Sequence, residues 1–98
     1  PFGWTPIEHG ARAIVHAARA TSTRREAAEA ASVYERIGSA ASRWVERAAT
    51  EAPHARPNEE TRAAFRDEWG ALVDEFAATS KRLKTYGPDL AQHVLSLR

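Results

Sequence analysis

The feature that most constrains this chain is a single proline-containing interruption, PHARPN at residues 53–58, between two long stretches of helical periodicity. Two prolines within five residues stop a helix, and Asn58, which precedes two glutamates, is a typical cap for the next one. On both sides apolar residues recur three and four positions apart, and no run of β-branched residues alternates with polar ones. The chain is therefore predicted to be all-α, with two helical arms joined by one turn.

The first arm is predicted to be one long kinked helix over residues 6–52. The tetrapeptide TPIE at residues 5–8 is a good start for it, because its threonine can cap, its proline fits the first helical position and its glutamate completes a capping box. The phase of the apolar residues slips near Ser22, where three hydroxyl residues stand in a row. This slip predicts a kink, a short break or a stutter at that point.

The second arm is predicted to be a helix over residues 59–86 that continues after a Gly-Pro kink to residue 98. Large apolar residues recur every seven positions along it: Trp69, Phe76, Leu83, Leu90 and Leu97. Because this heptad series crosses the Gly-Pro dipeptide without losing phase, the last segment is expected to follow the same partner helix. Together the two arms predict an elongated antiparallel helical hairpin.

Because the two helical arms are nearly equal in length, the turn between them also predicts which residues lie in contact. Folding the chain about residues 55 and 56 places Trp44 near Trp69, and the same register places Tyr34 beside Phe76. The alternative is a compact bundle of three or four helices, in which the first helix folds back across the others. The phase slip favours the bundle, whereas the heptad series favours extension; we predict the elongated hairpin and keep the bundle as the alternative.

Length and composition indicate a single helical domain over residues 1–98. Its apolar fraction of 43% is inflated by alanine, so a compact globule would be thinly filled and a partner would suit the chain. Methionine is absent even from position 1, and we therefore expect a fragment of a larger protein, with no intact signal peptide. The apolar runs are too short for a transmembrane segment. We expect a soluble chain, and the sequence assigns it no cellular location.

Residues that could carry chemistry are scattered. The chain has no cysteine, which excludes a disulfide scaffold, a thiolate metal site and a cysteine nucleophile. His9 and His16 lie seven apart, unlike a helical metal pair, and Glu51 with His54 forms one isolated Glu-x-x-His at a proline-broken helix end. No G-x-S-x-G motif or phosphate-binding glycine loop is present. We predict that the protein is not an enzyme and has no catalytic, metal-binding or cofactor-binding residues, and no cofactor.

Charge argues against a nucleic-acid surface. The 14 basic and 13 acidic residues are interspersed and give a net charge of +1, which is typical of a solvated protein surface. Arg36, Arg43 and Arg47 could form a basic ridge, but Glu35 and Glu46 interrupt it. A nucleic-acid-binding helical module therefore ranks behind the protein-binding hypotheses.

We predict a structural or scaffolding helical segment that mediates protein–protein interaction or dimerisation within a larger protein or assembly. The second hypothesis is a small secreted or adaptor helical protein that binds a partner helix. Two helices leave an apolar row uncovered, and such a row usually marks an interface. A second copy would cover it most simply, as a homodimer, with other parts of a parent protein as the alternative partner. The predicted interface residues are Trp4, Val15, Val33, Val45, Val73, Tyr86 and Leu95.

Overall fold

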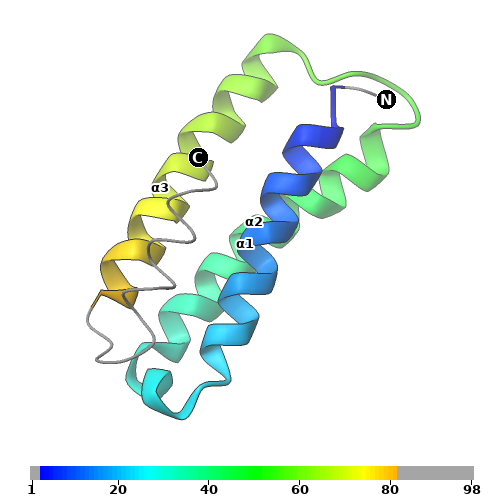
Figure 1. Cartoon of the computed structure of the whole chain (residues 1–98). Coiled ribbons are helices and arrows are strands. Elements are labelled where there is room, and N and C mark those ends of the chain that lie inside the picture. The colour runs from blue at the N-terminus through cyan, green and yellow to red at the C-terminus, as the bar shows by residue number, and fades with distance from the viewer. Residues whose placement is uncertain (1–2, 82–98) are drawn as a thin grey trace.

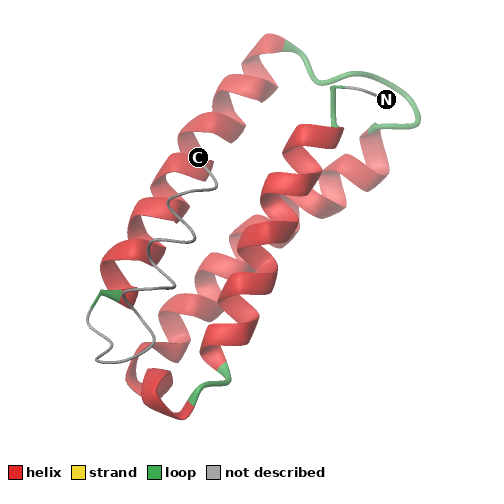
Figure 2. Ribbon diagram, in the orientation of Figure 1, coloured by secondary structure: helices red, strands yellow, loops and turns green. Residues whose placement is uncertain are grey.

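A computed structural model of the chain describes residues 3–81, and these are almost entirely helical (Figures 1 and 2). The elements, in order, are α1 (Thr5–Ser22), the short 3-10 helix η1 (Arg25–Ala30), α2 (Ala31–Glu51) and α3 (Glu59–Ser80). No strand occurs among the described residues, and the all-α prediction is confirmed. The predicted extension of the last helix, including the Gly-Pro kink and the segment to residue 98, lies outside the described residues.

The first arm is not one continuous helix. α1 ends at Ser22, η1 turns the chain, and α2 begins at Ala31, so the predicted single helix over residues 6–52 is wrong (Figure 1). The break falls where the apolar phase slips in the sequence. Ser22 and Thr23 each donate a hydroxyl hydrogen bond of 3.0 Å to a carbonyl three residues earlier. Such hydroxyl groups compete with the backbone for its partners, which is the physical reason that a helix ends readily here.

After the break, α2 runs antiparallel to α1 and lies alongside it, and α3 runs antiparallel to α2 (Figure 1). A glycine lies where α1 contacts each of the other two helices, and the tighter of the two contacts is at Gly10. A β-carbon at Gly38 of α2 would lie 3.4 Å from the β-carbon of Ala18 in α1. One at Gly10 of α1 would lie 3.1 Å from the Trp69 ring of α3. Small residues thus let the three helices approach one another closely.

The contact between α2 and α3 follows the predicted register at its centre. The rings of Tyr34 and Phe76 lie 5.1 Å apart, as predicted, and the Tyr34 hydroxyl forms a buried hydrogen bond of 3.0 Å with the Ser80 hydroxyl. Nearer the turn the pairing differs from the prediction by one helical turn. The ring packed on Trp44 is that of Phe65, at 5.2 Å, and Trp69 lies beyond Phe65.

The dimensions reflect the folding back of α1. The principal extents are 44 × 20 × 16 Å and the radius of gyration is 13.9 Å. A compact domain of this length has a radius of gyration of about 13 Å. One straight helical arm of the predicted hairpin would by itself extend for roughly 65 Å.

Small-angle X-ray scattering tests this arrangement. We expect a maximum dimension of roughly 55 Å, which is the 44 Å extent of the backbone with side chains added at both ends. A dimer formed side by side would keep that length and increase only the cross-section. A rod-like profile with a maximum dimension above about 65 Å would contradict the fold-back of α1.

Core substitutions test the packing of α3. Phe76 is fully buried, whereas Trp69 is half-buried. Phe76→Ala should therefore lower the free energy of unfolding by about 3–5 kcal/mol, and Trp69→Ala by about half as much, although tryptophan is the larger side chain. Urea denaturation followed by circular dichroism measures both values, with Phe76→Leu as the volume control. A larger loss for Trp69→Ala than for Phe76→Ala would be inconsistent with this core.

Candidate functional site

Among residues 3–81, a groove follows the seam between α1 and α2. A part of about 600 Å³ lies near the η1 end of the seam, and a part of about 200 Å³ continues it toward the other end. The two parts share Arg19, Ser42 and Glu46 as lining residues. We treat them as one surface and call it the α1–α2 groove.

Small side chains line much of the groove. Ala18 and Ser22 come from α1, and Gly38, Ser39 and Ser42 come from α2. Gly38 and Ala18 are also the residues at the closely packed seam, so the groove lies directly over this contact. In the smaller part, Val15 and Val45 add apolar surface. Small and apolar groups of both helices thus form part of the groove lining.

Charged side chains of both signs border the groove: Arg12, Arg19, Glu35, Arg43 and Glu46. Arg12 forms an ion pair with Glu8 at 2.8 Å. In contrast, the side chains of Glu35, Arg43 and Glu46 form no ion pair or hydrogen bond with another residue in the described part of the chain. Among the charges that border the groove, these three thus differ from Arg12, which has a partner on its own helix.

On its other flank, α2 has its charges paired within the chain. Arg36 forms an ion pair with Glu75 of α3, and this hydrogen-bonded contact raises the pKa of Arg36 above its ordinary value. The indole nitrogen of Trp44 donates a hydrogen bond of 2.9 Å to Glu68 of α3. Arg36 and Trp44 thus have partners in α3, whereas Glu35, Arg43 and Glu46 on the groove side have none among residues 3–81.

Three of the predicted interface residues are buried within the chain. Trp4 is 2% exposed, Val15 is 7% exposed and Val73 is 0% exposed. Their placement in an exposed apolar row is therefore wrong. The prediction assumed a two-helix hairpin, whereas the folding of α1 against α2 and α3 supplies the cover that a partner was expected to provide.

The other predicted interface residues have different positions. Val33 and Val45 are half-buried at the edge of the core, and Val45 lines the groove. Tyr86 and Leu95 lie outside the described residues. Sequence reasoning missed the polar side of the groove because it searched for apolar rows. The signal was present as serines and charged residues spaced three or four apart on the outer side of α2.

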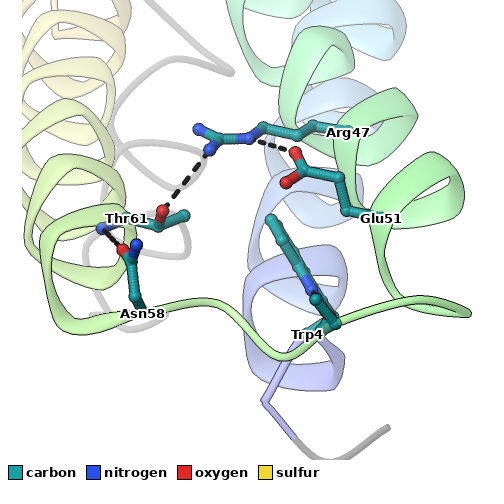
Figure 3. Close-up of polar contacts among 6 residues, drawn as sticks. Trp4, Arg47, Glu51, Asn58 and Thr61 are labelled. Carbon is teal, nitrogen blue, oxygen red and sulfur yellow. Dashed lines mark hydrogen bonds and ion pairs between the residues drawn. The ribbon is translucent and has the colours of Figure 1, made fainter.

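A second polar cluster lies where the chain crosses the end of the helices, and it is centred on Arg47 (Figure 3). The Arg47 guanidinium carbon lies 5.4 Å from the Trp44 ring centroid and 5.8 Å from that of Trp4, which places the cation over two aromatic faces. The same guanidinium pairs with Glu51 and donates a 3.4 Å hydrogen bond to Thr61. Arg47 therefore connects the start of α1, the end of α2 and the start of α3.

The neighbours of Arg47 fix the loop between α2 and α3. The Asn58 side chain accepts a hydrogen bond of 2.8 Å from the backbone N–H of Thr61, which confirms the predicted cap of α3 (Figure 3). The indole nitrogen of Trp4 donates a 2.8 Å hydrogen bond to the carbonyl of Ala55 in the loop. Glu51, one half of the isolated Glu-x-x-His, is occupied by its ion pair with Arg47. We interpret this cluster as structural.

Two further observations concern the described residues as a whole. Among residues 3–81, no group of three or more histidine, aspartate or glutamate side chains is placed to hold a metal ion. None of the helices described is both long enough and apolar enough to cross a membrane.

Replacing Arg47 tests its structural role. Arg47→Gln removes the cation from two aromatic faces and breaks the pair with Glu51, and it should lower the free energy of unfolding by about 1–2 kcal/mol. Arg66→Gln is the matched control, because both side chains of the Arg66–Glu59 ion pair are exposed, and it should change stability by less than about 0.5 kcal/mol. Thermal denaturation of both variants measures the difference. Equal effects would show that Arg47 does not hold the three elements together.

Comparison of the chain with protein-family models, with curated proteins and with solved structures finds no match.

Proposed function

We propose that this protein is a structural helical module that works by protein–protein association, and that the α1–α2 groove is its binding surface. The observation that supports this most is the combination of small lining residues with rim charges that have no partner among the described residues. Small residues allow a helix to approach closely. Unpaired charges at a rim favour one partner and one orientation over others.

In this proposal the chain is a compact helical bundle and not an elongated hairpin. The folding of α1 along α2 and the radius of gyration of 13.9 Å support the compact form. Arg36 and Trp44, which contact α3, do not line the groove, so association through the groove leaves these α2–α3 contacts in place.

A second copy of the chain is the partner that we propose. Most soluble oligomers consist of identical copies related by a two-fold axis. The rim of the groove carries both signs of charge, so one copy can satisfy another without a net like-charge contact. A rim of one sign would instead require a partner of opposite charge.

Sedimentation equilibrium tests the proposal. The wild-type protein should have twice the chain mass of 10.8 kDa at tens of micromolar. Ser42→Trp fills the groove at the residue shared by its two parts, and this variant should sediment as a monomer. Ala64→Trp places the same bulk on an exposed position of α3, away from the groove, and should leave the dimer intact.

Circular dichroism melts establish that both tryptophan variants are folded. A wild-type protein that remains a monomer would contradict the proposed homodimer. A Ser42→Trp variant that stays as dimeric as the wild type would contradict the assignment of the groove as its surface.

A further inference from the structure

The charges beside the groove have a symmetry about Ser39 that specifies how two copies meet. Glu35 precedes Ser39 by four residues and Arg43 follows it by four. All three side chains are exposed and line the groove. Building on the proposed homodimer, we infer that α2 of one copy packs antiparallel on α2 of the other across a two-fold axis at Ser39, with Glu35 of each copy paired to Arg43 of the other.

Helix geometry brings these residues to one face. With 3.6 residues per turn, positions four before and four after Ser39 lie about 40° to either side of it, each about 6 Å along the axis. A two-fold axis through Ser39 exchanges these positions between the copies. Each glutamate therefore meets an arginine, and the dimer contains the pair twice.

The same charges disfavour a dimer in which the two α2 helices are parallel. In a parallel pair in the same register, Glu35 would face Glu35 and Arg43 would face Arg43, so both contacts would repel. In the antiparallel pair both contacts attract. The charges thus select an orientation, which is the usual contribution of ion pairs at the rim of an interface.

The centre of the contact allows close approach. Ser39 is exposed on α2 at the proposed axis, and Ser42 is half-buried beside it. Side chains of this size permit helix axes near the lower end of the usual range of about 8–10 Å. At that separation the long side chains at positions 35 and 43 can span from one helix to the other.

No contact within the described chain competes for the two charges. Glu35 and Arg43 form no side-chain hydrogen bond or ion pair with another described residue. Being eight residues apart on one helix, they are about 12 Å apart along the axis and do not reach each other directly. In contrast, Arg36 on the other flank is held by Glu75. An interchain pair therefore breaks no interaction between described residues of the monomer.

Charge reversal tests the inference in full-length protein. Glu35→Arg and Arg43→Glu each create two repulsive contacts, and each should raise the dimer dissociation constant at least about tenfold. The double variant E35R/R43E restores both pairs with the signs exchanged, and its dissociation constant should be within about threefold of wild type. Sedimentation velocity over a dilution series measures these constants. Asp67→Arg and Arg56→Glu are matched controls at exposed positions away from the groove.

A mixture of the two single charge-reversal variants is the most discriminating test of the register. An equimolar mixture of Glu35→Arg and Arg43→Glu chains places arginine opposite glutamate at both contacts. The mixture should therefore form a heterodimer about as tightly as the wild type forms its homodimer. Failure of the mixture to associate while the wild type dimerises would overturn the proposed register.

A single-cysteine variant reports the axis directly, because the chain has no cysteine of its own. Ser39→Cys should form a disulfide-linked dimer with oxidised glutathione, since residues on a two-fold axis bring their β-carbons close enough for a disulfide. Ala64→Cys, on the exposed side of α3, should remain largely monomeric under the same conditions.

The outcomes separate the two proposals. A monomeric wild type would remove the homodimer and this inference together. A dimeric wild type whose dissociation constant is unchanged by Glu35→Arg, Arg43→Glu and their double variant would overturn only the register. Equal cross-linking of Ser39→Cys and Ala64→Cys would also overturn the register.

Discussion

Close packing of α1 on α2 is the constraint on which the rest of this structure depends. Gly38 of α2 lies opposite Ala18 of α1, and η1 returns the chain so that the two helices lie side by side. This contact lets Ile14 of α1 join Tyr34 of α2 and Phe76 of α3 in one core. It also sets the small-residue lining of the groove on the outer side of the same seam. Core and surface therefore have a common origin in one helix–helix contact.

The charged side chains on the two flanks of α2 differ in whether they have partners among the described residues. Toward α3, Arg36 pairs with Glu75 and Arg47 connects two tryptophan rings to its ion pair with Glu51. Toward the groove, Glu35 and Arg43 have no described partner. A surface pair adds little stability to a monomer, because solvent screens it and ordering two long side chains costs entropy. The groove charges are better suited to selecting a partner and its orientation.

Because the core is buried within one chain, association is not needed to cover it. The sequence, interpreted as a two-helix hairpin, led to the expectation that a second copy would cover an apolar row. Trp4, Val15 and Val73 are instead covered within one chain. In the proposed dimer the partner therefore meets a surface of serines and charges, and the core does not depend on it. Such an interface is expected to be reversible and to weaken with salt, because charge contributes much of its specificity.

The sequence by itself determined the helical class, the turn at residues 53–58, the cap at Asn58 and the pairing of Tyr34 with Phe76. Each follows from local chemistry or from a register that one short turn fixes. Only the tertiary structure decided that α1 lies beside α2 and not beyond it. The hydroxyl residues near Ser22 predict a break in the helix, but they do not determine the direction in which the chain leaves it. That direction depends on contacts between residues distant in the sequence, such as Ala18 with Gly38, and the burial of Trp4 and the position of the groove follow from it.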